Sequence, residues 1–144
     1  MFPLPEDSAK LIGTWKLISY EIELQDTGDR VFPWGKHPIG YLILTPEGRM
    51  MALLEKDGRT PPKTDEERAA AFLSMLAYTG IYRVEGDKWI TKVDASWHPA
   101  LKDADQVRSF KLEGDRLSVV SMWQPHPFVS EKTARGILSW ERAT

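Results

Sequence analysis

The amino-acid sequence predicts an all-β fold of eight antiparallel strands in up-and-down order, with one amphipathic helix. Apolar and polar residues alternate along several segments, which is the two-residue period of a strand with one buried face. Short glycine-containing turns join most of these segments, as in consecutive hairpins. A single segment has the helical period, so the helix is an addition to a β fold.

The strands follow one another along the whole chain. A short helical turn, capped by Asp7 or Ser8, is expected before the first strand. The stretch 31–40 contains two prolines and two glycines and is typical of a loop. The eight predicted strands are Thr14–Leu24, Tyr41–Thr45, Arg49–Lys56, Tyr78–Val84, Lys88–Trp97, Gln106–Leu112, Arg116–Met122 and Gly136–Arg142.

The helix is predicted within Lys63–Ala77. Thr64 is followed three residues later by Glu67, which is the spacing of a capping box. An apolar stripe follows at helical spacing, and we expect it to lie against the barrel wall or over an opening. The stripe consists of Ala69, Phe72, Leu73 and Leu76.

Composition limits the classes of function. A chain of 144 residues predicts a single domain over residues 1–144, large enough to bury a core without disulfides or metals. It contains no cysteine, and its net charge of −2 argues against nucleic acid as a partner. The N-terminal residues do not resemble a signal peptide, and no apolar run is long enough to span a membrane, so we expect a cytoplasmic protein.

Eight antiparallel strands form either a sandwich or a closed barrel, and a barrel of this size has room for one small ligand. The stretches GTWKLISYE, AYTGIYRVEGDKW, QVRSFKLEGDRL and SWER, in this order and spacing, resemble the bacterial and fungal lipocalin-like domain family from Gly13 to Arg142. The resemblance implies an eight-stranded lipocalin-like barrel with a central cavity. The sequence departs from the family pattern at Thr91, where many members carry a histidine. A mechanism that uses this histidine therefore cannot be transferred to this chain.

The resemblance also implies how one end of the barrel is closed. In lipocalin-like barrels the G-x-W tryptophan lies near the closed end and is crossed by an arginine of the last strand. The matching residues are Trp15 and Arg142. Such a cation–π contact contributes about 0.5–2 kcal/mol.

Strand parity predicts which side chains face the cavity. If Trp15 points inward, Ser19 and Glu21 share its face, unless a bulge intervenes. In the sixth strand a lysine favours water, so we expect Arg108 and Phe110 to face inward instead of Lys111. A buried arginine is costly without a partner, which is either a ligand oxygen or a side chain, namely Glu21, Tyr41, Tyr78 or Tyr82. Alternatively, its guanidinium extends to water. Other expected ligand-binding residues are Tyr41, Tyr78, Tyr82, Trp89, Trp97 and His98.

The three histidines, His37, His98 and His126, each precede a proline and are expected in turns or extended segments. None has a metal-ligand spacing to another, so no metal site is predicted. His98 is either an ordinary loop residue or an acid or base at the cavity mouth. No nucleophile elbow and no glycine-rich phosphate loop occurs in the sequence, and no cofactor is expected.

Two classes of function fit this sequence. In the first, the barrel binds a small apolar molecule, acidic or carbonyl-bearing, with aromatic walls and Arg108 for orientation. In the second, the same cavity is a cofactor-independent cyclase or isomerase of secondary metabolism that acts by positioning and by one or two hydrogen bonds. A barrel filled by its own side chains stays open as a third alternative. The sequence leaves the oligomeric state open.

Overall fold

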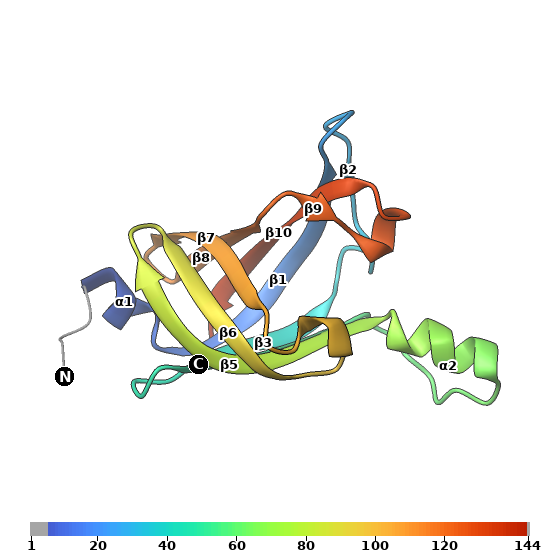
Figure 1. The fold of residues 1–144 in the computed structure, drawn as a ribbon, viewed down its shortest axis with the longest axis horizontal. Coiled ribbons are helices and arrows are strands. Elements are labelled where there is room, and N and C mark those ends of the chain that lie inside the picture. Colours follow the sequence, from blue (N-terminus) through green and yellow to red (C-terminus); the bar gives the residue numbers. More distant parts are fainter. Residues whose placement is uncertain (1–5, 144) are drawn as a thin grey trace.

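The computed structural model describes residues 6–143, which form a closed antiparallel β-barrel (Figure 1). From β3 to β8 each strand pairs with the next along the chain, and β10 pairs with both β8 and β1. The pairing of β1 with β10 closes the sheet and confirms the predicted eight-stranded, up-and-down barrel. Its strands are β1 (Gly13–Leu24), β3 (Ile39–Leu44), β4 (Arg49–Glu55), β5 (Met75–Glu85), β6 (Lys88–Ser96), β7 (Asp105–Glu113), β8 (Arg116–Ser121) and β10 (Thr133–Arg142).

Short elements lie at the ends of the barrel. The two-residue strands β2 (Arg30–Val31) and β9 (Gln124–Pro125) pair with β1 and β10, and they are too short to show a period in the sequence. The N-terminal turn is helix α1 (Glu6–Leu11). Two 3₁₀ turns, η1 (Pro99–Leu101) and η2 (Pro127–Val129), each begin directly after a histidine.

Alternating burial along the strands builds the core. In β3 the residues Gly40, Leu42 and Leu44 are buried, and the residues between them are exposed. Tyr41 therefore lies on the outer wall and is 45% exposed, so the expectation that it faces the cavity is wrong. The reason is the strand period, because Tyr41 alternates with the buried Leu42.

A β-bulge in β1 changes which residues face inward. Leu17 pairs with Trp140 and Ser19 pairs with Ser139, so one extra residue, Ile18, stands between two pairs that are adjacent on β10. The bulge reverses the parity, and Tyr20 is buried beyond it. Ser19 and Glu21 therefore do not share the inward face of Trp15, and their predicted place in the cavity is wrong.

A second irregularity lies between β5 and β6. Thr79 pairs with Ala95 and Gly80 pairs with Val93, which leaves Asp94 as the extra residue. A Cβ atom at position 80 would overlap the carbonyl oxygen of Lys92. Glycine is therefore needed here for the close approach of the two backbones.

The predicted helix is present but stands apart from the core. Helix α2 (Asp65–Phe72) begins with the predicted capping box, in which the Thr64 hydroxyl accepts from the Glu67 N–H at 3.0 Å. It contains no buried residue and projects from the end of the barrel opposite α1 (Figure 1). Phe72 of the expected apolar stripe packs on Trp97 and His98 at this end of the barrel. The rest of the stripe does not pack as expected, because Ala69 and Leu73 are exposed and Leu76 belongs to β5.

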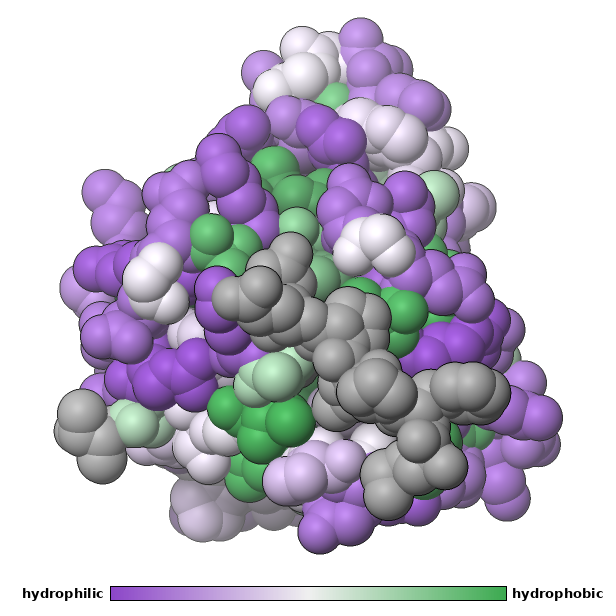
Figure 2. All heavy atoms as spheres, turned by 90° about the vertical axis from the view of Figure 1, so that its left-hand side faces the viewer, coloured by the Kyte–Doolittle hydropathy of each residue, from purple (hydrophilic) through white to green (hydrophobic). Residues whose placement is uncertain are grey.

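The two ends of the barrel are built from different parts of the chain. At the end where α1 lies, the described surface is largely hydrophilic at its margin, with hydrophobic residues gathered toward the middle (Figure 2). Leu11 and Trp15 are fully buried here. The opposite end carries α2, η1 and η2, and the cavity lies toward it.

Candidate functional site

The end of the barrel near α1 is closed by Trp15 and Arg142. The Arg142 guanidinium carbon lies 4.2 Å from the centre of the Trp15 ring, which is the cation–π contact that the resemblance implies. The Trp15 indole N–H donates to the Leu11 carbonyl at 2.9 Å. Arg142 donates to the carbonyls of Ile12 and Lys10 at 3.0 and 2.6 Å. These contacts bind the last strand to the segment that precedes the first.

Gly13 is required in this arrangement for two reasons. Its φ angle of +132° belongs to the region that side chains disfavour. A Cβ atom at this position would also lie 2.9 Å from Nη1 of Arg142. The glycine of the G-x-W motif therefore makes room for the arginine that covers the tryptophan.

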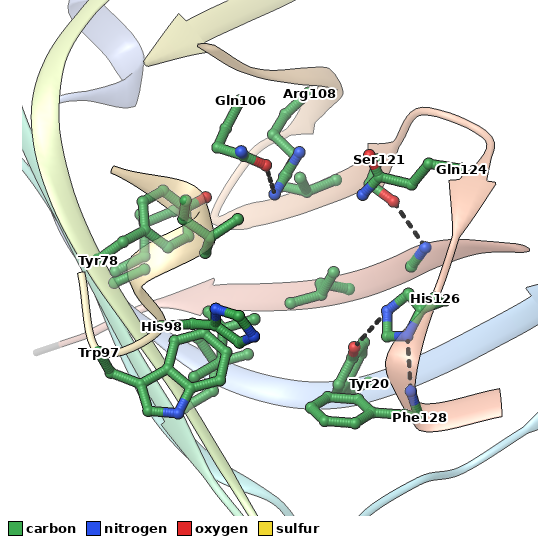
Figure 3. Close-up of a pocket in the computed structure, with 18 of the residues that line it drawn as sticks. Tyr20, Tyr78, Trp97, His98, Gln106, Arg108, Ser121, Gln124, His126 and Phe128 are labelled. Carbon is green, nitrogen blue, oxygen red and sulfur yellow. Dashed lines mark hydrogen bonds between the residues drawn. The ribbon is translucent and has the colours of Figure 1, made fainter. Parts of the chain in front are cut away.

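A cavity of about 430 Å³ occupies the other half of the barrel (Figure 3). Its wall comes from all eight barrel strands and from the segments around η1 and η2. Exposed residues such as Ala100 and Gln124 belong to its lining, so it reaches the surface at this end. Its volume is in the range of small-molecule sites.

The structure brings together half of the residues predicted to bind a ligand. Tyr82 and Phe110 do not line the cavity: the Tyr82 hydroxyl donates to the Thr45 carbonyl at 3.1 Å, and Phe110 packs on Trp89 with ring centres 6.2 Å apart. Ligand binding by the residues in the wall stays a prediction. The predicted residues that line the cavity are Tyr78, Trp89, Trp97, His98 and Arg108.

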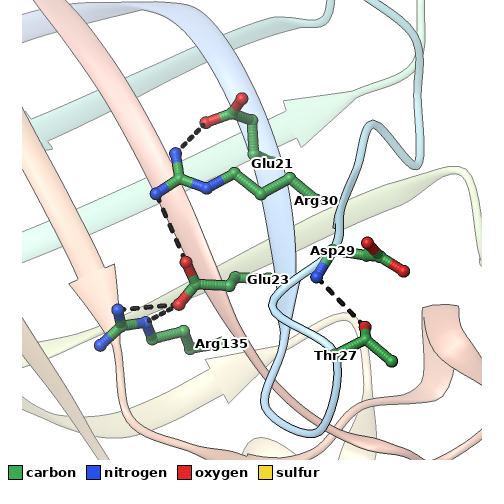
Figure 4. A network of polar contacts seen from close by, with 6 residues as sticks. All are labelled: Glu21, Glu23, Thr27, Asp29, Arg30 and Arg135. Atoms are coloured by element: carbon green, nitrogen blue, oxygen red, sulfur yellow. Dashed lines mark hydrogen bonds and ion pairs between the residues drawn. The ribbon is translucent and has the colours of Figure 1, made fainter.

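Glu21 belongs to an ion-pair network outside the cavity (Figure 4). Arg30 lies between Glu21 and Glu23, at 3.3 and 3.4 Å, and Glu23 also accepts from Arg135 at 2.8 Å. Arg30 is half-exposed, so solvent screens its contacts and each contributes little to stability. The network joins β1, β2 and β10 at their ends, and Glu21 is not the partner of Arg108.

Arg108 extends from β7 into the cavity, as parity in that strand predicts (Figure 3). Its guanidinium donates to the Val107 carbonyl and to Oε1 of Gln106, both at 3.1 Å. It forms no ion pair with a carboxylate among residues 6–143. Arg108 is therefore a half-buried cation whose two acceptors are neutral groups. Its guanidinium has five N–H donors, so some of them remain available to a bound molecule.

Tyr20 and His126 form a second polar group in the wall, which the sequence reasoning missed. The Tyr20 hydroxyl lies 3.3 Å from Nε2 of His126, and Nδ1 of His126 accepts from the Phe128 N–H at 3.2 Å. Burial raises the pKa of Tyr20 against the opposing effect of Arg108. Burial, and secondly the charge of Arg108, lowers the pKa of His126 to about 4. Both groups are therefore neutral at pH 7.

The sequence held no decisive signal for His126. His98 and His126 both cap a 3₁₀ turn through Nδ1. The His-Pro pair that they share does not predict a place at the cavity, because the exposed His37 is also followed by proline. Tyr20 had no such signal either, because a bulge decides its orientation.

A family model described as a lipocalin-like domain matches residues 12–143. The chain belongs to this lipocalin-like domain family. Curated proteins gave no match.

Two aromatic groups border the cavity of this lipocalin-like domain. On one side Phe72, Trp97 and His98 pack with ring centres 5.4–5.5 Å apart. On the other side Trp34 contacts Tyr20 and Phe128, at 5.1 and 5.5 Å. The indoles of both groups hold the C-terminal end of α2, because Trp97 donates to the Phe72 carbonyl and Trp34 to the Leu73 carbonyl. The otherwise exposed helix is thereby fixed at the cavity mouth.

Three further observations concern Thr91, groups of metal-ligand side chains and membrane-spanning helices. Thr91, the position at which many family members carry histidine, is fully buried and does not line the cavity. Within residues 6–143 no three acidic, histidine or cysteine side chains are grouped to hold a metal ion. The same part of the chain contains no helix of the length and apolarity needed to cross a membrane.

Proposed function

We propose that this lipocalin-like domain binds a small apolar molecule in the barrel cavity and that Arg108 contacts an acid or carbonyl oxygen of that molecule. The supporting observation is the Arg108 guanidinium, which lines an otherwise mainly apolar cavity and has no carboxylate partner among the described residues. Charge in such a place is costly unless it is paired, and a ligand oxygen supplies the pair.

The wall supplies the apolar part of the interaction. Leucines, tyrosines and tryptophans from several strands surround the space beside Arg108. Aromatic walls with a few placed polar groups are the usual composition of small-molecule sites. The cyclase or isomerase alternative would use the same cavity and stays a prediction, as does the cytoplasmic location.

The test is the change Arg108→Leu, which keeps apolar bulk and removes the charge. A hydrogen bond to a charged group contributes about 1.5–3 kcal/mol, so the variant should bind a fluorescent fatty acid such as cis-parinaric acid at least about tenfold more weakly. A neutral probe, N-phenyl-1-naphthylamine, should bind nearly as before. Both affinities are measured by fluorescence titration.

Arg116→Leu is the matched control, because Arg116 is exposed on the neighbouring strand β8. It should change neither affinity. Equal affinity of Arg108→Leu and the parent for the acid would remove Arg108 from the site. Failure of the parent to bind any apolar probe would overturn the proposed function itself.

A further inference from the structure

The Tyr20 hydroxyl ends a directed chain of hydrogen bonds in the cavity wall. The Phe128 N–H donates to Nδ1 of His126, so that nitrogen carries no proton. A neutral imidazole then holds its proton on Nε2, and this N–H donates to the Tyr20 oxygen. The hydrogen of the Tyr20 hydroxyl is therefore not used by His126.

This hydrogen has no acceptor within the described residues. Tyr20 is only 4% exposed, lines the cavity, and makes no hydrogen bond besides that with His126 among residues 6–143. Figure 3 shows the Tyr20 hydroxyl and the His126 ring side by side at the cavity, on the side opposite Arg108. A buried donor without an acceptor is unfavourable, and an oxygen atom of a bound molecule would relieve this.

The chain also makes Tyr20 a better donor. The His126 N–H withdraws electron density from the phenol oxygen and so polarises its O–H bond. The pKa of His126, lowered by burial and by Arg108, keeps the imidazole neutral and thus the direction of the chain unchanged at pH 7. Tyr20 remains a protonated phenol because burial raises its pKa.

His98 repeats the same arrangement across the cavity. Its Nδ1 accepts from the Ala100 N–H at 3.1 Å, which again leaves the proton on Nε2. Arg108 can only donate. The groups with an assigned direction, Arg108, Tyr20 and His98, therefore all present donors to the cavity. The carboxylate in the lining, Glu131, is exposed at its edge.

We propose that Tyr20 donates a hydrogen bond to a ketone-type carbonyl oxygen of the bound molecule. The inference rests on the proposed function and narrows its ligand class to apolar carbonyl compounds. A carbonyl oxygen accepts without having to donate, so it matches a wall whose fixed groups are donors. An alcohol in the same place would bring a hydrogen for which these groups offer no acceptor.

The test uses a fluorescent ketone, 6-propionyl-2-(dimethylamino)naphthalene, whose emission shifts to longer wavelength when its carbonyl accepts a hydrogen bond. Tyr20→Phe removes the hydroxyl alone. It should weaken binding of the ketone about three- to tenfold, the effect of a neutral hydrogen bond, and shift the emission of the bound probe to shorter wavelength. N-phenyl-1-naphthylamine, which has no carbonyl, should bind within about twofold of the parent.

Two tyrosines supply matched controls. Tyr82→Phe removes a hydroxyl that donates to the Thr45 carbonyl outside the cavity wall, and it should leave the bound emission unchanged. Tyr78→Phe removes a second hydroxyl of a cavity-lining tyrosine. If Tyr78→Phe produces the loss and the shift while Tyr20→Phe does not, the proposal is overturned.

A second variant tests the chain without changing Tyr20. His126→Asn keeps a side-chain acceptor for the Phe128 N–H and removes the donor to Tyr20. It should also weaken binding of the ketone, though less than Tyr20→Phe. Unchanged binding and emission of the ketone in both variants would overturn the inference and leave the proposed function standing.

The parent protein separates the remaining outcomes. Binding of the naphthylamine without the ketone overturns the inference alone, because the carbonyl class is then excluded. Binding of neither probe, nor of the fluorescent fatty acid, overturns the proposed function together with the inference. A loss of ketone affinity together with an emission shift to shorter wavelength, seen only in Tyr20→Phe and His126→Asn, would support Tyr20 as the donor to the carbonyl.

Discussion

At the closed end of the barrel, Trp15 and Arg142 donate to three backbone carbonyls, those of Leu11, Ile12 and Lys10. At the open end, Arg108 and Tyr20 face a cavity and keep donors for which the described residues offer no acceptor. Both ends contain aromatic rings and a cation, so composition does not distinguish them. The two ends differ in whether the chain itself supplies hydrogen-bond acceptors for the donors that they contain.

This difference separates a structural site from a binding site. A satisfied donor stabilises the fold, because folding replaces its hydrogen bond to water by one to the chain. An unsatisfied donor at a cavity costs stability, and such a cost is typical of functional sites. The closed end should therefore respond to mutation mainly in stability, and the open end mainly in ligand affinity.

The largest expected effect is at the closed end. Trp15→Ala should lower the free energy of unfolding by about 3–5 kcal/mol, because Trp15 is fully buried and its removal leaves a cavity. Trp97→Ala at the half-buried mouth should cost clearly less. Both are measured by chemical denaturation, and equal losses at the two positions would contradict the comparison.

A double-mutant cycle sharpens this result. The loss caused by Arg142→Ala should be smaller in the Trp15→Ala background, by about 0.5–2 kcal/mol, since the cation–π contact is then already gone. Additive losses would mean that the two side chains contribute independently, and that the closed end is held by the hydrogen bonds alone.

The open end should show a pH dependence. The pKa of His126 is lowered from 6.5 to about 4, so between these values the unfolded chain binds more protons than the folded chain. The free energy of unfolding should therefore fall as the pH drops from about 6.5 to about 4. We expect His126 to contribute ~1–2 kcal/mol of this loss, less than full linkage gives because the ring is partly exposed.

Comparison with His126→Asn isolates this contribution from that of the carboxylates, which titrate in the same range. The variant should lose less stability than the parent between pH 6.5 and pH 4.5 in urea denaturation. His37→Asn, at an exposed histidine, is the matched control and should behave as the parent. Parallel curves for the parent and His126→Asn would show that the histidine is not coupled to folding.

The smallest effect on global stability is expected at α2. Thr64→Ala removes the cap and should cost about 1 kcal/mol of local helix stability. Because α2 buries no residue, the global free energy of unfolding should hardly change. Hydrogen exchange should report faster opening of residues 65–72 alone, and a global loss of 1 kcal/mol would instead place the helix in the core.

The alternating pattern along the chain predicted the eight strands and their order, because the side-chain period of a strand is local. The choice of a closed barrel over a sandwich came from the resemblance to the family. The alternating pattern also placed Arg108 in the interior, since β7 continues through that position without an irregularity. The capping box predicted the start of α2 for the same reason: all of its atoms lie within four residues. The direction in which the helix leaves the barrel depends on where β5 begins. The sequence of the helix does not contain this information.

By itself, the sequence determined the strand order and the lipocalin-like family, and through the family the Trp15–Arg142 contact. Only the tertiary structure decided the polar wall of the cavity. Because of one extra residue in β1, Tyr20 faces inward in place of Ser19 and Glu21. This bulge arises from pairing with β10, more than a hundred residues away. The partnership of Tyr20 with His126 likewise joins residues 106 positions apart. A pattern of period two reports the neighbours of a residue along the chain, whereas the free hydroxyl in the cavity results from neighbours that closure of the barrel brings together.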